Sequence, residues 1–210
     1  SPEAQNLRLQ IKEGPFTKTD WPVTFIPDKA PLITKQPMQK IEENGVISLP
    51  LMLKDDYGVT ALHFDLQLDN SQVLEGPIYA NPYSERRPIA VPGGETPQEI
   101  TQKLDLTSHL WAGLPVTLTI KAEDAASQMS GIRQIQMILP ERAFSHPVAR
   151  YLIEQRQSLA WNGIAALEDV AEALIHATSD PAKLNDDSVA FLTLSSAFYR
   201  IIYAPSEKTV

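Results

Sequence analysis

The chain has 210 residues, of which 43% are hydrophobic and 21% are charged, close to the averages for globular proteins, so long disordered tracts are not expected. Its net charge of -8 and pI near 5.0 argue against nucleic-acid binding, because affinity for a phosphate backbone comes from clustered Lys and Arg. Cysteine is absent, which excludes disulfides and thiolate ligation of zinc or iron.

Apolar residues recur at every second position through residues 1–140, and this spacing predicts β-strands. Short strands are predicted at 6–12, opening a β-domain, and at 21–26, along an edge. A third strand at 47–53 leads through a turn at Asp55-Asp56-Tyr57-Gly58 into a long strand at 59–68, and we expect these two to pair as a hairpin. Further strands at 100–106, 116–122 and 135–139 bring the number to about seven, as in an immunoglobulin-like or fibronectin-like β-sandwich. Trp111 is expected to close one end of the core.

A long loop is predicted between the strands, over residues 70–97, because prolines and glycines interrupt the alternation there. The loop contains Tyr79, Tyr83, Arg86 and Arg87, and Tyr and Arg are the residue types that anchor interfaces. It is either a solvated connection or a surface that binds a glycan or a peptide.

The spacing of apolar residues becomes helical after Pro147, which suits the first position of a helix. Residues 141–210 are predicted to form an antiparallel helical hairpin, with a first helix at 147–178 that Asn162-Gly163 can kink or divide. The second helix follows Asp186-Asp187-Ser188 and places Phe191, Leu194, Phe198 and Ile201 on one face. Leu192, Tyr199, Ile202 and Tyr203 lie off that face, so they either pack in a larger core or form an interface. Tyr199 and Tyr203 are therefore candidate partner contacts.

No catalytic apparatus is visible in the sequence. The four histidines, His63, His109, His146 and His176, lack any metal-ligand spacing, and the GxSxG, GxGxxG and P-loop motifs are missing. Asp55-Asp56 and Glu123-Asp124 offer carboxylates for calcium, but aspartates at strand ends ordinarily bond to their own turns. We expect no catalytic residue, no cofactor and no metal site.

Several segments together resemble a family of long alphaproteobacterial membrane proteins of unknown function. They are Trp21-Pro-Val-Thr-Phe-Ile-Pro-Asp, Lys54-Asp-Asp-Tyr-Gly-Val, Trp111-Ala-Gly-Leu-Pro-Val, Lys121-Ala-Glu-Asp-Ala-Ala-Ser-Gln, Leu139-Pro-Glu-Arg-Ala-Phe and Glu154-Gln-Arg-Gln-Ser-Leu-Ala. The resemblance implies transmembrane helices near the N-terminus of the full protein, then an envelope-facing region that ends in Gln- and Gly-rich sequence. It implies no catalytic residues.

These observations favour a non-catalytic interaction or scaffold module from the periplasmic side of a membrane-anchored envelope protein. Its expected partners are other regions of the same protein, another envelope protein, or a second copy bound through the helices. A third reading is an accessory region of an enzyme whose active site lies elsewhere. No run of about 18 apolar residues is present, so this part is expected to be soluble and not to insert into a membrane.

Overall fold

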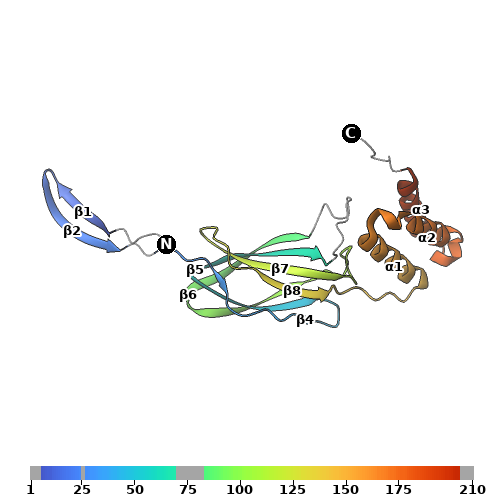
Figure 1. Cartoon of the computed structure of the whole chain (residues 1–210), viewed down its shortest axis with the longest axis horizontal. Coiled ribbons are helices and arrows are strands. Elements are labelled where there is room, and N and C mark those ends of the chain that lie inside the picture. The colour runs from blue at the N-terminus through green and yellow to red at the C-terminus, as the bar shows by residue number, and fades with distance from the viewer. Residues whose placement is uncertain (1–5, 25–26, 70–82, 204–210) are drawn as a thin grey trace.

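A computed structural model describes residues 6–24, 27–69 and 83–203. These residues form β-strands followed by helices, arranged from one end of the molecule to the other (Figure 1). The strands are β1 (Asn6–Glu13), β2 (Phe16–Thr24), β3 (Leu32–Ile33), β4 (Lys40–Ile41), β5 (Ile47–Leu68), β6 (Ser84–Leu104), β7 (Pro115–Asp124) and β8 (Arg133–Ile138). The helices are α1 (Pro147–Asn162), α2 (Leu167–Thr178) and α3 (Ser188–Tyr203), with short 3-10 helices η1 (Gly163–Ala166) and η2 (Pro181–Leu184).

The first two strands form a separate hairpin. Among the described strands, β1 and β2 pair with each other alone, and the hairpin projects beyond one end of the β-domain (Figure 1). Leu9, Ile11, Trp21 and Val23 are exposed on it. The prediction that these strands belong to the main β-domain was therefore wrong, because alternation shows that a strand has an apolar face but not what that face packs against.

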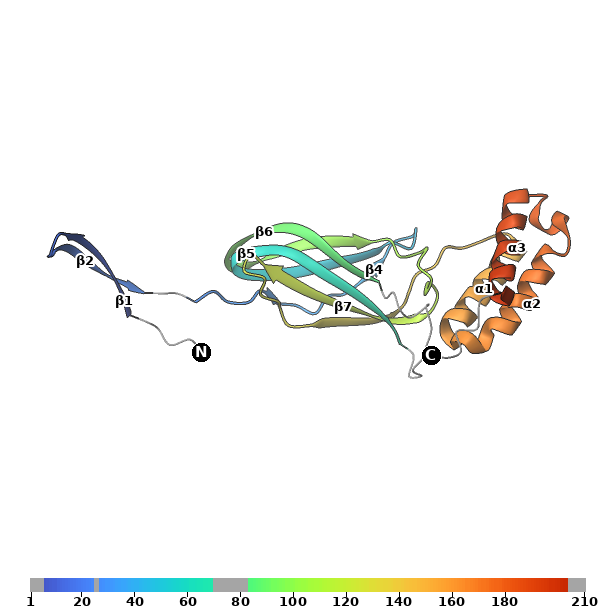
Figure 2. The same ribbon diagram turned by 90° about the horizontal axis from the view of Figure 1, so that it is seen from above.

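In the described part of the chain the main sheet has six strands, rather than about seven, and its pairs are antiparallel. β5 runs through its centre. The first part of β5 pairs with β3, β4 and the end of β6, whereas its second part pairs with the start of β6 and with β7. Both long strands curve at the end of the β-domain nearest the β1–β2 hairpin (Figure 2). The described chain is thus mainly antiparallel β-sheet followed by helices, as predicted.

The curve lies at Asp55-Asp56-Tyr57-Gly58, where the sequence predicted a hairpin turn. Instead β5 continues through this segment, with register shifts against β6 on both sides of it. The Asp55 carboxylate accepts hydrogen bonds from the backbone N–H groups of Tyr57, at 3.0 Å, and Gly58, at 2.6 Å. Gly58 has φ +117°, and a Cβ there would lie 2.5 Å from the carbonyl oxygen of Val91 on β6. The segment is therefore a corner at which a continuous strand changes direction.

Strand β6 occupies much of the predicted loop. Residues 84–97 belong to it, and residues 70–82, which include Tyr79, lie outside the described part. Among the described residues β6 pairs with β5 alone, so it is an edge strand there. The backbone N–H groups that Pro88 and Pro92 lack therefore break no pairing with a second described neighbour. Prolines are tolerated on such an edge strand, and for this reason the loop prediction was wrong over 84–97.

One core fills the folded sheet. It joins Leu49, Leu51 and Leu53 from the first part of β5 with Leu62, Phe64 and Leu66 from the second part, all fully buried. Leu118 and Ile120 of β7 lie in the same core, and Trp111 is buried in it.

Residues 147–203 contain three α-helices and not the predicted two-helix hairpin. The expected first helix begins at Pro147 but divides at Gly163, whose φ of +59° ends α1. The start of α3 agrees with the sequence, because the Asp187 carboxylate accepts hydrogen bonds from the N–H groups of Val189 and Ala190. Val170 and Leu174 of α2 pack with Leu152 and Leu159 of α1 and with Leu194, Phe198 and Ile201 of α3.

Candidate functional site

Two of the predicted recognition residues at the start of β6, Tyr83 and Arg87, are bound to Glu85. The Arg87 guanidinium donates to both carboxylate oxygens of Glu85, at 2.8 and 3.0 Å, and to the backbone oxygen of Lys103 at 2.8 Å. It also lies 5.6 Å from the centre of the Phe64 ring. The Tyr83 hydroxyl donates to Glu85 as well, and burial together with this carboxylate raises the pKa of Tyr83. Both side chains therefore support the fold.

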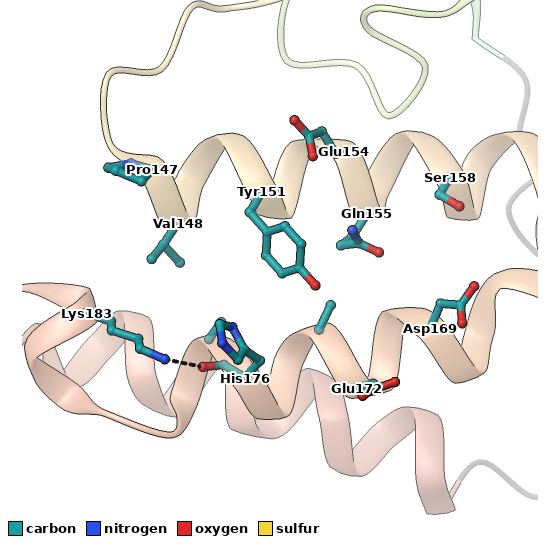
Figure 3. Close-up of a pocket in the computed structure, with 12 residues that line it drawn as sticks. Pro147, Val148, Tyr151, Glu154, Gln155, Ser158, Asp169, Glu172, His176 and Lys183 are labelled. Atoms are coloured by element: carbon teal, nitrogen blue, oxygen red, sulfur yellow. Dashed lines mark hydrogen bonds between the residues drawn. The ribbon is translucent and has the colours of Figure 1, made fainter.

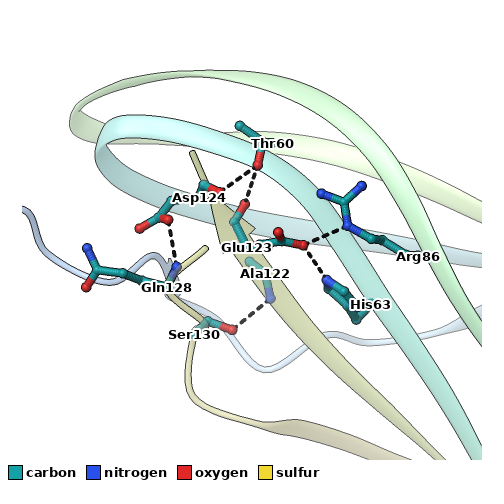
Figure 4. Close-up of polar contacts among 8 residues, drawn as sticks. All are labelled: Thr60, His63, Arg86, Ala122, Glu123, Asp124, Gln128 and Ser130. Atoms are coloured by element: carbon teal, nitrogen blue, oxygen red, sulfur yellow. Dashed lines mark hydrogen bonds and ion pairs between the residues drawn. The ribbon is translucent and has the colours of Figure 1, made fainter. Parts of the chain in front are cut away.

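Arg86, on the other face of β6, belongs to a polar network around Glu123 of β7 (Figure 4). The Glu123 carboxylate lies 2.8 Å from Nε of Arg86 and 2.6 Å from Nε2 of His63 on β5. Hydrogen bonds from Arg86 and His63 lower the pKa of Glu123 to about 2. The Arg86 side chain is 52% exposed but its Nε is already committed, so the network joins three strands rather than presenting a free cation.

Three of the four carboxylates considered for calcium, those of Asp55, Glu123 and Asp124, are bound to other groups of the protein. Asp55 binds the N–H groups of the β5 corner, and Asp124 accepts from the N–H of Gln128 at 2.8 Å. Glu123 is engaged with Arg86 and His63. Across the described ranges, no group of three His, Asp or Glu side chains could hold a metal ion.

The remaining histidines are spread over the molecule. His109 packs edge-on against both Tyr83 and Trp111, and burial, followed by the charge of Arg156, lowers its pKa. His146 precedes α1 without making a side-chain cap, and His176 lies on α2 beside Tyr151. The structure brings none of the four together.

An apolar surface runs along the outside of α3. Val189, Leu192, Ile202 and Tyr203 are between 53% and 74% exposed, and Tyr199 is 56% exposed. The rings of Tyr199 and Tyr203 stack with centroids 6.0 Å apart. Arg200 is the one charged residue of this helix. The helical spacing had placed Tyr199 and Tyr203 off the packed face, and they are exposed in the structure.

Helix α1 joins the β-domain to the other helices. On one side Arg156 and Gln157 both donate to the backbone oxygen of Ala112, at 2.9 and 3.1 Å, and Ala160 enters the core of the β-domain. On a second side Leu152 and Leu159 pack against α2 and α3. The helix thus holds the two parts of the chain together.

A groove, which the sequence analysis did not predict, follows the third side of α1 (Figure 3). We call it the α1–α2 groove; it has a volume of about 1000 Å³. Tyr151, Gln155 and Ser158 of α1 face Ala173, His176 and Ala177 of α2 across it. Tyr151 and His176 meet edge to face, with ring centroids 6.3 Å apart. Ala173 and Ala177, one turn apart, are the signal that could have revealed a shallow floor on α2.

The described residues form a mainly antiparallel β-domain followed by three α-helices. The chain belongs to the family described as "Domain of unknown function (DUF4175)", whose model matches residues 3–210. No curated protein matches the chain. None of the helices in the described ranges is long and apolar enough to cross a lipid bilayer.

Three solved structures show a distant likeness to this chain. An inactive form of OgpA from Akkermansia muciniphila, in complex with an O-glycopeptide, is 11% identical with a TM-score of 0.33, and the match covers 50% of this chain and 29% of OgpA. The PKD domain of an M14-like peptidase from a Thermoplasmatales archaeon is 13% identical with a TM-score of 0.30, over 55% of this chain and all of that domain. A β-glucosidase from Kluyveromyces marxianus is 10% identical with a TM-score of 0.31, over 56% of this chain and 15% of the enzyme. These scores are too low to support a functional argument.

Proposed function

We propose that the chain is a non-catalytic interaction or scaffold module, with an immunoglobulin-like β-sandwich, that associates through the exposed face of α3. The observation that carries the proposal is the set of apolar side chains on α3 that its neighbouring helices leave uncovered. Exposed apolar patches of this kind mark sites of association in soluble proteins. The β-domain, tied to α1 through Ala112, would position this surface.

The sequence resemblance supports a place for the module in the extracytoplasmic, periplasmic region of a membrane-anchored bacterial envelope protein. Its partners would then be other regions of the same protein, another envelope protein or a second copy. Glycan or peptide binding by the 70–97 segment has less support, since Tyr83 and Arg87 are already bonded to Glu85. No observation favours an accessory role in an enzyme.

Self-association is the form of the proposal that the chain can test directly. We expect the parent to associate at micromolar concentrations in sedimentation velocity, and Tyr199→Glu or Tyr203→Glu to shift it toward monomer, because a charge placed in an apolar contact must be desolvated. Ile175→Glu on α2 is the matched control, since Ile175 is 51% exposed but lies outside α3. Circular dichroism should show an unchanged fold. A parent that stays monomeric throughout, or equal losses in all three variants, would contradict self-association through α3.

A further inference from the structure

The α1–α2 groove is a second surface, distinct from the exposed face of α3. We propose that it binds an amphipathic helix with basic flanks, supplied by a partner protein. The proposal rests on the shape of the groove, on the charge of its rim and on the arrangement of the three helices.

The floor of the groove can receive a helix. Ala173 and Ala177 line the groove and have small side chains that do not project into it, so a helix lying over α2 can approach its backbone closely. Val148 and Tyr151 line the α1 side, and the Tyr151 ring points into the groove (Figure 3). On α1 the lining runs from Pro147 to Ser158, a length of roughly 17 Å at 1.5 Å per residue. A helix of about three turns would fill that length.

The rim of the groove is acidic. Glu154 of α1 and Asp169 and Glu172 of α2 line it and are exposed. Within the described ranges none of these carboxylates has an ion-pair or hydrogen-bond partner. The one cation in the lining, Lys183, lies at the Pro147 end and donates to Ser179 Oγ and to the backbone oxygen of His176. An occupant with Lys or Arg beside its apolar seam therefore matches the rim.

The helix packing also leaves room for one more helix. Leu152 and Leu159 of α1 and Val170 and Leu174 of α2 pack in the core that these helices share with α3. Other faces of α1 and α2 line the groove. A helix in the groove would complete a four-helix arrangement.

The occupant is assigned to a different protein because the described helices of this chain do not supply one. α2 has no Lys or Arg, and α3 has only Arg200. α1 has Arg150 and Arg156, but it forms one wall of the groove itself, and its Arg156 is hydrogen-bonded to the β-domain. The chain as a whole carries a net charge of -8, which opposes insertion of a second copy between acidic side chains.

The test uses the whole chain and a fluorescein-labelled model peptide of about 14 residues, with Leu at helical spacing and Lys on its flanks. A second peptide carries Glu in place of Lys. In fluorescence anisotropy we expect the Lys peptide to bind and the Glu peptide to bind at least tenfold more weakly. NMR shifts at Tyr151 and His176 should accompany binding of the Lys peptide.

Two variants form a matched pair. Asp169→Lys reverses a charge that lines the groove, whereas Glu168→Lys reverses its neighbour, which lies outside it. Both lie in the first turn of α2, so both lose the same favourable interaction with the helix dipole. We expect Asp169→Lys to weaken binding of the Lys peptide about fivefold, as one reversed rim charge would, and Glu168→Lys to change it less than about twofold. Gln155→Trp, which fills the groove, should abolish binding.

Three results would overturn the proposal. Equal binding of the two peptides would show that the rim does not select charge. Equal losses in Asp169→Lys and Glu168→Lys would show attraction to net charge without a site. A parent chain that dimerises, and that Gln155→Trp converts to monomer, would show that a second copy occupies the groove. None of these readouts depends on the α3 face, so failure here is distinguishable from failure of the proposed function.

Discussion

Replacement of Gly58 by alanine tests the corner of β5 directly. The added Cβ would lie 2.5 Å from the carbonyl oxygen of Val91 and 3.1 Å from the backbone nitrogen of Gly93, so β5 or β6 would have to move. The φ of +117° is also unfavourable for any residue with a Cβ, at a cost of about 1–3 kcal/mol. Overpacking against a neighbouring strand costs about 1–3 kcal/mol more. Gly58→Ala should therefore lower the free energy of unfolding by about 2–6 kcal/mol.

Alanine substitutions at three other glycines separate the cost of the backbone conformation from the cost of the steric clash. Gly94 has φ +153° with open space around it, so alanine there tests the backbone conformation alone. A Cβ on Gly93 would lie 2.4 Å from the backbone oxygen of Asp56, so alanine there tests the clash alone. Gly131 has neither feature, and Gly131→Ala should stay within about 0.5 kcal/mol of the parent.

Urea titrations of the four variants give the free energies of unfolding, provided that the slope with denaturant is unchanged. The expected order of destabilisation places Gly58→Ala first, Gly93→Ala and Gly94→Ala between, and Gly131→Ala last. If Gly58→Ala and Gly93→Ala both match Gly131→Ala, β5 and β6 do not approach each other at this corner, and the account of a continuous bent strand is refuted.

Three further predictions concern the β-domain. Leu118→Ala should lower the free energy of unfolding by about 2–5 kcal/mol in denaturant titrations because it leaves a cavity, whereas Thr117→Ala on the other face of β7 should cost far less; equal losses would be inconsistent with this core. Because the pKa of Glu123 is lowered from 4.5 to about 2, its ionised form stabilises the fold above pH 4.5, and that contribution is lost as the pH falls toward 2. Glu123→Gln should therefore be destabilising near neutral pH and approach the parent in acid, and a pH-independent difference would contradict the ion pair with Arg86. A fragment of residues 1–140 should be soluble and melt cooperatively, since its core is complete apart from Ala160; a melt without a transition would show that the helices are required.

The β-core could be read from the sequence because burial imposes a period of two on a strand. Leu62, Phe64, Leu66 and Leu118 were placed correctly on this basis. The corner could not be read, because Asp55-Asp56-Tyr57-Gly58 has the composition of a turn whether the chain reverses or only bends. What decides between the two is the close approach of Gly93, and that contact is between residues far apart in the sequence.

The two candidate surfaces also differed in how far the sequence could predict them. Exposure of Tyr199 and Tyr203 follows from helical spacing within one element, so the sequence was sufficient. The α1–α2 groove depends on the break at Gly163, which lets α2 turn back along α1, and on how far apart the two helices then lie. Its lining mixes small, apolar and charged residues, and on each helix alone this mixture looks like a solvated face until both helices are placed.

The continuity of β5 and β6 through the corner determines how the β-domain opens. A sandwich made of two independent sheets can separate between its layers while each ladder stays intact. Here β5 and β6 both continue through the corner, so each layer contains part of both strands. One layer cannot separate without displacing the other, because the two are connected at Gly58 and Gly93. Amide hydrogens of residues 49–53 and of residues 62–66 should therefore exchange through one shared opening with the same free energy, which makes the two layers a single cooperative unit.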